Sequence, residues 1–306
     1  MFEILQELEG NNQKLVTNFF IEGVHPSILI ISQNGRRIFL DSRDPYISVH
    51  YLQTQSWEPH VSIVYENALD SFKASRLVMK SRAVFIDCGA NIGLHSIRAA
   101  DIGYEVFAFE PDPVTYKFLE LNGIINGLQI NPSQVAVSDV EGMLEFTVDT
   151  RSSGMSGLSK SDSGVGRFTG QNDPHKRFQH IPVNSITLSK NFADEVKEET
   201  AGLLCLKIDT EGSEGDVLAG ARDLIDKFDN YVIICEMHLD NFNLIEQYVQ
   251  IVETAVSNGK IVNMQLLRFM EDPLAINHLD SSTWHQHGAG DLALFVSSGD
   301  IKLFMA

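Results

Sequence analysis

The chain has 306 residues, of which 43% are hydrophobic and 21% charged, an ordinary composition for a globular protein and an unlikely one for a disordered chain. The formal net charge of −18 at pH 7 repels polyanions, so we expect neither nucleic acid nor an anionic membrane as a partner. Residues 1–9 lack a basic flank and a long apolar run, and no stretch approaches the roughly 20 apolar residues that span a bilayer. The sequence predicts neither a signal peptide nor a membrane anchor.

The three cysteines, Cys88, Cys205 and Cys235, are too widely spaced for a metal knuckle, and their odd number leaves at least one unpaired. Each lies in or beside an apolar run that we expect to be a buried strand. The sequence therefore predicts reduced core thiols and a cytoplasmic protein.

Residues 1–80 are expected to form an N-terminal extension packed on the core. The apolar runs at 27–31 and 37–41 flank Asn34-Gly35, a dipeptide typical of a β-hairpin turn. Apolar residues at helical spacing between Ser62 and Lys80 predict a helix that leads into the first central strand.

Residues 81–306 are expected to form the main domain, which opens with the short apolar run Ala83–Asp87 before a glycine turn. This run is too apolar for an exposed strand and too short for a helix, so it predicts a strand covered on both faces. The elements that follow predict a β-α-β-α-β repeat of a doubly wound sheet: the turn Cys88–Gly93, a helix from Asn91 to Asp101, a strand from Glu105 to Glu110, a helix from Asp112 to Asn122, and a strand from Ser133 to Ser138.

The pattern changes after Asp139. Residues 142–148 alternate as a half-exposed antiparallel strand does, and residues 181–186 are its expected partner. Between them, residues 151–180 are expected to form a flexible insertion rich in glycine and serine. Its basic residues outnumber its acidic ones: Arg151, Lys160, Arg167, Lys176 and Arg177 against Asp162 and Asp173. We interpret it either as a solvated loop or as a lid whose basic residues touch an anionic or polyhydroxylated substrate.

Regular structure resumes at Leu203, and no linker separates two domains. The expected elements are a buried strand from Leu203 to Asp209, a helix through Leu218 and Ile225, a strand from Tyr231 to Glu236, a helix from Asn243 to Ser257, and two final strands from Lys260 to Leu267 and from Asp291 to Ser297, the last of them antiparallel.

Ligands of an open α/β sheet bind beyond the carboxyl ends of its strands. Gly89 and Gly93 allow the turn after the first strand to approach a ligand and the next helix to pack closely. Glu110, at the tip of the second strand, can accept hydrogen bonds from both hydroxyls of a ribose. We therefore expect an adenosine-containing cofactor at this edge of the sheet.

The glycine spacing distinguishes between such cofactors. A dinucleotide fingerprint needs Gly-x-Gly-x-x-Gly, but Asn91 occupies the middle position, so a pyrophosphate would lack its close approach. Acidic residues at the rim (Asp87, Glu110 and Asp139) repel phosphates and favour an ammonium group, a ribose and an adenine amino group. S-adenosyl-L-methionine fits this rim better than a dinucleotide does.

Several motifs together resemble those of the FkbM-type methyltransferases. They are Phe85–Gly93, Ala108–Pro111, Asn122, Ala136–Asp139, the block Lys207-Ile208-Asp209-Thr210-Glu211-Gly212-Ser213-Glu214, and Leu218–Ala221. The Lys-x-Asp-x-Glu-Gly-x-Glu block is the most specific of them. The resemblance implies a class I methyltransferase fold, which is a Rossmann-like α/β fold with a doubly wound seven-stranded sheet. It also implies O-methylation of a hydroxyl on a sugar, polysaccharide or natural product, with S-adenosyl-L-homocysteine as the second product.

The resemblance also implies roles for individual residues. Asp87, Gly89, Asn91 and Gly93 would hold the methionine portion of the cofactor, Glu110 and Pro111 the ribose, and Val137, Ser138 and Asp139 the adenine edge. Asp209 and Glu211 would face the methyl group. Beyond the resemblance, our hypothesis is that Asp209, Glu211 and His238 are catalytic: Asp209 or His238 is the general base, and Glu211 and Glu236 orient the acceptor or its base.

Three alternatives stay open at this point. Asp209, Glu211, Glu236 and His238 could hold Mg²⁺, although a metal is not favoured, and His278, His285 and His287 beside Trp284 are a weaker metal signal. The acceptor atom could be a nitrogen of a peptide or small molecule. The chain could also be a nucleoside-binding protein without catalysis. The expected partner is a small-molecule or glycan acceptor, whose identity these residues do not give.

Overall fold

The computed structural model describes residues 17–19, 27–31, 35–42, 44–75, 81–159, 177–194, 202–237, 242–268, 273–276 and 290–298. The predicted His238 and the histidines near the C-terminus lie outside these residues.

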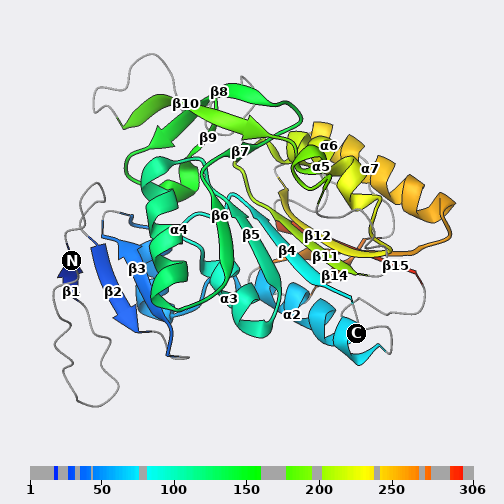
Figure 1. The fold of residues 1–306 in the computed structure, drawn as a ribbon, viewed down its shortest axis with the longest axis horizontal. Coiled ribbons are helices and arrows are strands. Elements are labelled where there is room, and N and C mark those ends of the chain that lie inside the picture. Colours follow the sequence, from blue (N-terminus) through cyan, green and yellow to red (C-terminus); the bar gives the residue numbers. More distant parts are fainter. Residues whose placement is uncertain are drawn as a thin grey trace.

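A mixed sheet crosses the centre of the molecule (Figure 1). Among the described residues it has eight strands in the order β14-β13-β15-β12-β11-β4-β5-β6, one more than the seven expected, because the two-residue β14 adds to one edge. The strands from β12 to β6 are parallel, and β15 runs antiparallel between β12 and β13, as predicted for the last strand. The bounds are β4 Ala83–Cys88, β5 Glu105–Phe109, β6 Ile130–Ser133, β11 Leu203–Ile208, β12 Asn230–Met237, β13 Ile261–Leu267, β14 Leu274–Ala275 and β15 Gly290–Ser297.

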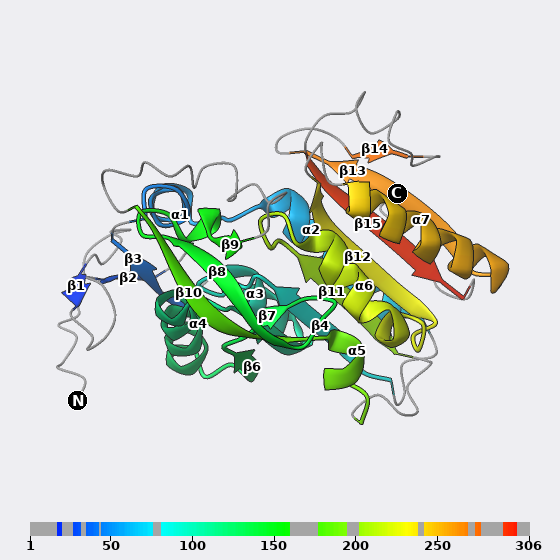
Figure 2. The same ribbon diagram turned by 90° about the horizontal axis from the view of Figure 1, so that it is seen from above.

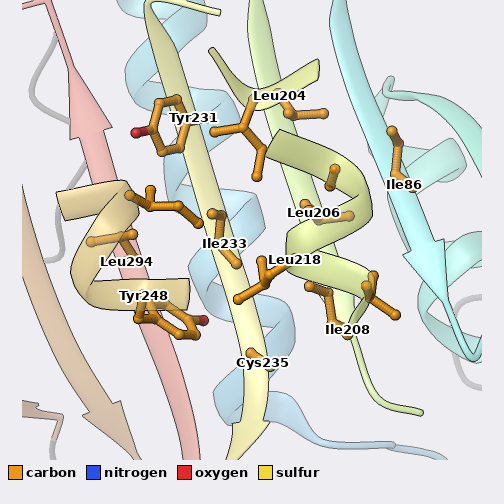
Figure 3. Close-up of a cluster of buried hydrophobic side chains, with 14 of the residues drawn as sticks. Ile86, Leu204, Leu206, Ile208, Leu218, Tyr231, Ile233, Cys235, Tyr248 and Leu294 are labelled. Carbon is orange, nitrogen blue, oxygen red and sulfur yellow. The ribbon is translucent and has the colours of Figure 1, made fainter. Parts of the chain in front are cut away.

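Helices cover both faces of this sheet, which explains why its central strands are apolar throughout. Leu204, Leu206 and Ile208 of β11 pack on one face with α6 Glu214–Ile225 and α7 Phe242–Ser257. Figure 3 shows Leu218 of α6 and Tyr248 of α7 on this face of the sheet, near Ile233 of β12 and Leu294 of β15. On the other face, Leu203 and Cys205 pack with α2 Pro59–Ala74 and, through Ala99, with α3 Leu94–Ile102. All three cysteines are buried and free, as predicted.

Two helices begin at residues other than the predicted ones. α2 starts at Pro59 rather than Ser62, because proline suits the first helical position, where its missing N–H costs nothing. α3 starts at Leu94, since Gly93 with φ +88° still belongs to the turn. The predicted capping of α4 Pro113–Ile125 is confirmed, since Asp112 accepts a hydrogen bond from the Val114 amide at 2.9 Å.

The prediction of a third central strand at Ser133–Ser138 is wrong. The strand that pairs with β5 is β6, an edge strand that tolerates Pro132 within it. The apolar residues that suggested the strand form β7 Ala136–Val137, which belongs to a second sheet. Ala136 packs within the second sheet, whereas Val137 packs against the core of the central sheet.

The second sheet has the order β7-β10-β8-β9 and lies beside the carboxyl ends of the central strands (Figures 1 and 2). β8 Gly142–Asp149 and β10 Phe178–Ile186 pair antiparallel, as predicted. The expected loop at 151–180 is in part regular structure, because η2 Ser153–Met155 and β9 Gly157–Leu158 fold back along β8. Residues 160–176 lie outside the described residues.

The N-terminal segment forms a small sheet of β1 Thr17–Phe19, β2 Ser27–Ile31 and β3 Arg37–Asp41, followed by α1 Ile47–Thr54. The predicted hairpin is confirmed by the antiparallel pairing of β2 with β3. The buried Asn122 of α4 joins β3 to the glycine turn. Its side-chain oxygen accepts from the Phe39 amide at 2.6 Å, and its amide group donates to the carbonyls of Phe39 at 3.1 Å and Ile92 at 2.9 Å. None of the described helices is long and apolar enough to cross a membrane.

We predict that Asn122→Ala lowers the free energy of unfolding by about 2–4 kcal/mol, because it leaves buried backbone groups of β3 and the turn unsatisfied. The matched control is Asn126→Ala one turn later, which removes similar bonds to Arg37 at a more exposed position, where water replaces them. We expect the control to cost less than about 1 kcal/mol. Urea unfolding of both variants measures the difference, and equal losses would contradict the role given to Asn122.

Candidate active site

A cavity of about 290 Å³ lies at the carboxyl ends of β4, β5, β11 and β12. Motifs more than a hundred residues apart in the sequence meet in its wall. Of the predicted site residues, those that line it are Gly89, Asn91, Glu110, Pro111, Val137, Asp209, Glu211 and Glu236. The sheet therefore brings most of the expected site together.

The glycines of the turn make room for protein atoms. Gly89 has φ +76°, and a Cβ built on it would lie 1.8 Å from the carbonyl oxygen of Asp209. A Cβ on Gly93 would lie 2.6 Å from Leu119 Cδ1 on α4, which fits the predicted close packing of the helix. For Gly89, the missing side chain makes room for the backbone after β11, and the predicted approach to a ligand stays a prediction. The turn and the Asp209 backbone are therefore in direct contact.

Glu110 is held by the backbone around it. Its two carboxylate oxygens accept hydrogen bonds from the amides of Asn91 at 3.0 Å and Asp112 at 2.9 Å. Burial and the nearby charge of Asp112 raise its pKa to about 8, although these two bonds oppose the rise. Each oxygen keeps a second lone pair, so the side chain can still accept a hydrogen bond from a ligand hydroxyl.

Four predicted cofactor residues do not line the cavity. Asp87 is buried behind it, where Oδ2 accepts from Ser96 Oγ at 2.6 Å and Oδ1 lies 3.5 Å from Lys207 Nζ. Gly93 serves the packing of α3. Ser138 is buried and donates to Asp139 at 3.1 Å, while Asp139 itself is exposed outside the cavity. The expected direct contacts of Asp87, Ser138 and Asp139 with a cofactor are not supported by these positions.

Three carboxylates gather where β11 and β12 end. Oxygen atoms of Asp209, Glu211 and Glu236 all lie within 4.8 Å of one another. Burial raises the pKa of Asp209 to about 8; Lys207, whose Nζ lies 3.3 Å from its Oδ2, opposes the rise, and Glu236 adds to it. Burial and the charge of Asp209 raise the pKa of Glu211 to about 10. Such a cluster of oxygens can serve as ligands for a hard divalent cation. It can also act as a general base, because the raised pKa of Asp209 makes its carboxylate a stronger base.

Parts of the wall were not predicted as site residues, and they come from the N-terminal extension and the insertion. Tyr46, Ile47, Trp57 and Glu58 come from the extension, and Phe146, Leu158 and residues 152–156 from the second sheet. Figure 2 shows α1 beside β9, where these two parts meet. Gly154 allows the contact, since a Cβ on it would lie 3.2 Å from Ile47 Cδ1.

Ser153 connects the insertion with the N-terminal extension and with the glycine turn. Its hydroxyl donates to Asn91 Oδ1 at 3.1 Å and lies 3.4 Å from Asp44 Oδ2. Local sequence carries little signal for such contacts.

Lys207 also lines the cavity and was not predicted as a site residue. The sequence did carry a signal for it, because Lys207 opens the Lys-x-Asp-x-Glu-Gly-x-Glu block.

The strand order of the central sheet, with β15 inserted antiparallel between β12 and β13, is that of the class I S-adenosylmethionine methyltransferases. The family model of the methyltransferase FkbM domain matches residues 87–261, more than half of the chain. The chain belongs to this family.

Known proteins are similar over parts of the chain. The 31-O-demethyl-FK506 methyltransferase FkbM of Streptomyces tacrolimicus is 30% identical over an alignment of 156 residues that covers 46% of this chain and 60% of that relative. The match thus spans less than two thirds of the relative. A SAM-dependent methyltransferase from Agrobacterium tumefaciens has a TM-score of 0.45 and 10% identity, with 88% of this chain and 69% of that chain covered. M. jannaschii TYW2 in complex with AdoMet has a TM-score of 0.38 and 11% identity, with 92% and 91% covered.

Proposed function

We propose that this chain is an S-adenosylmethionine-dependent methyltransferase that methylates a hydroxyl of a sugar, polysaccharide or natural product. The observation that carries the proposal is the single cavity in which the turn Gly89–Asn91, Glu110 and Asp209 meet. The FkbM relative supports a hydroxyl acceptor, since its name describes an O-demethyl compound as substrate.

The cavity wall fits the cofactor chemically. In this proposal Gly89 and Asn91 bind the methionine portion, Glu110 and Pro111 the ribose, and Val137 the adenine; all five line the cavity. Acidic side chains outnumber basic ones among the described lining residues, which suits a cationic cofactor and disfavours a pyrophosphate. When bound, the cofactor supplies an electrophilic methyl group on a sulfonium.

We propose Asp209 as the base, because it lines the cavity and its carboxylate lies beside those of Glu211 and Glu236. A carboxylate of ordinary pKa is a weak base toward a hydroxyl, but burial raises the pKa of Asp209 to about 8, close to the value at which general bases work best near neutral pH. Asp209 would accept the hydroxyl proton while the acceptor oxygen takes the methyl group from the sulfonium, whose S–C bond breaks to leave S-adenosylhomocysteine. Glu211 and Glu236 lie beside it and orient the acceptor or the base.

We propose a neutral small molecule or glycan as acceptor. The described basic residues of the insertion do not line the cavity: Arg177 donates three hydrogen bonds to Asp149, at 3.0, 2.9 and 2.5 Å, and Arg151 lines a separate depression. This arrangement gives no support to an anionic substrate. The three buried thiols accord with a cytoplasmic location, and no metal is needed for the proposed proton transfer.

Calorimetry tests the cofactor assignment. We expect S-adenosylhomocysteine to bind with micromolar affinity, because the cavity offers acceptors for its ribose and ammonium groups, and we expect NAD to show no binding, since its pyrophosphate meets carboxylates. Binding of NAD without binding of S-adenosylhomocysteine would overturn the proposal.

We predict that turnover rises with pH through about 8 and then levels off, because Asp209 must be ionised to accept a proton. Asp209→Asn removes this dependence and lowers turnover by about 10²-fold or more, with S-adenosylhomocysteine affinity within about threefold. Asp223→Asn, an exposed position on α6, is the control and keeps wild-type turnover. Wild-type turnover in Asp209→Asn would remove this residue from the mechanism.

A further inference from the structure

Glu58 reaches the cavity from the N-terminal extension. It directly precedes α2 and has φ +40°, a left-handed conformation that non-glycine residues adopt at a cost. Its Oε2 lies 2.9 Å from Nε2 of His95, and Nδ1 of His95 lies 3.3 Å from the hydroxyl of the buried Tyr65. The His95 side chain is 5% exposed and that of Glu58 29%. The contact with His95 fixes the position of the Glu58 side chain, whose carboxylate stays accessible in the cavity wall.

The position of His95 places Glu58 next to the glycine turn. His95 is the second residue of α3, which begins directly after Gly93, and it lines the cavity together with Gly89 and Asn91. This is the end of the cavity to which the proposed function assigns the methionine portion of the cofactor.

The ammonium group of that methionine portion requires an acceptor, and the residue expected from the sequence is not placed to supply one. Oδ2 of Asp87 accepts a hydrogen bond from Ser96 Oγ at 2.6 Å; Oδ1 makes no hydrogen bond but lies 3.5 Å from Lys207 Nζ, and Asp87 is fully buried outside the cavity wall. Among the carboxylates of the wall, Glu58 is the one that contacts His95 at the start of α3, directly after the turn, so it can take this part.

We propose that Glu58, held in place by His95, binds the ammonium group of the methionine portion of the cofactor, so that the N-terminal extension completes the cofactor site. This inference rests on the proposed function. This role accounts for the left-handed backbone conformation of Glu58 and for the buried His95 beside it, neither of which packing alone requires.

The charge state of Glu58 agrees with this role. Burial raises its pKa, but the hydrogen bond and the charge of His95 outweigh burial and lower the pKa below its ordinary value. The pKa values of Asp209 and Glu211 are raised instead, to about 8 and about 10. At neutral pH, Glu58 is therefore an ionised partner for an ammonium group, whereas Glu211 is protonated and Asp209 largely so.

Two nucleosides that differ only in the amino-acid tail test the proposal by calorimetry. S-adenosylhomocysteine has the ammonium group, and 5′-methylthioadenosine lacks the whole tail. We expect Glu58→Gln to weaken S-adenosylhomocysteine at least tenfold, the loss of a hydrogen bond between charged groups, and to leave 5′-methylthioadenosine within about twofold. Glu66→Gln is the matched control: Glu66 also joins α2 to α3, through Arg98 at 2.7 Å, but does not line the cavity, so both affinities stay unchanged.

The positioning role of His95 has its own variants. His95→Leu should weaken S-adenosylhomocysteine selectively, as Glu58→Gln does, and His95→Gln, which keeps a donor toward Glu58, should restore most of the affinity. Unchanged S-adenosylhomocysteine binding in Glu58→Gln would overturn the inference, and so would an equal loss for both nucleosides, which would mean that Glu58 only supports the fold. A wild-type protein that binds neither nucleoside would overturn the proposed function and this inference with it.

Discussion

A buried lysine between two aspartates is the interaction on which the site depends. Lys207 of β11 lies opposite Asp87 of β4 in the sheet register, and its ammonium group is 3.5 Å from Asp87 and 3.3 Å from Asp209. Burying the charges of Lys207 and Asp87 is favourable only if they compensate each other, so the arrangement tolerates little displacement. It fixes the end of β11 against the glycine turn, where the missing side chain of Gly89 admits the Asp209 carbonyl. Asp209 is thereby held beside the turn proposed to bind the cofactor.

Around this centre, acidic groups outnumber basic ones among the described lining residues: Glu58, Glu110, Asp209, Glu211 and Glu236 against Lys207 and His95. Burial and mutual repulsion raise the pKa of several of these carboxylates, so the cavity retains protons that a bound cation would displace. The same field favours a cofactor that carries a sulfonium and an ammonium group and disfavours an anionic acceptor. We therefore attribute both the proposed binding of the cofactor and the raised pKa of Asp209 to one charge distribution.

The sequence predicted the elements whose signal is local. Strands buried on both faces, such as β4 and β11, appear as unbroken apolar runs, and the Gly89–Gly93 turn with Glu110 identified the edge of the sheet that carries the cavity. The edge strand β6 was missed because Pro132 and polar neighbours weaken its pattern, and Ala136–Val137 was misassigned because apolar character does not show which sheet buries a residue. Asp87 was expected in the cavity, but only tertiary packing shows that it faces Lys207. Glu58 and His95 meet across 37 residues, a contact that no local pattern encodes.

The central claim is that this chain transfers a methyl group to a hydroxyl. The most direct measurement is mass spectrometry of a metabolite and polysaccharide extract incubated with the protein and S-adenosylmethionine labelled in its methyl group. The account predicts a labelled product one methyl group heavier than a component of the extract, with fragmentation that places the label on oxygen, and no such product with Asp209→Asn. Label on nitrogen would contradict the proposed acceptor. The absence of any labelled product from extracts that support a known methyltransferase would contradict the proposed activity.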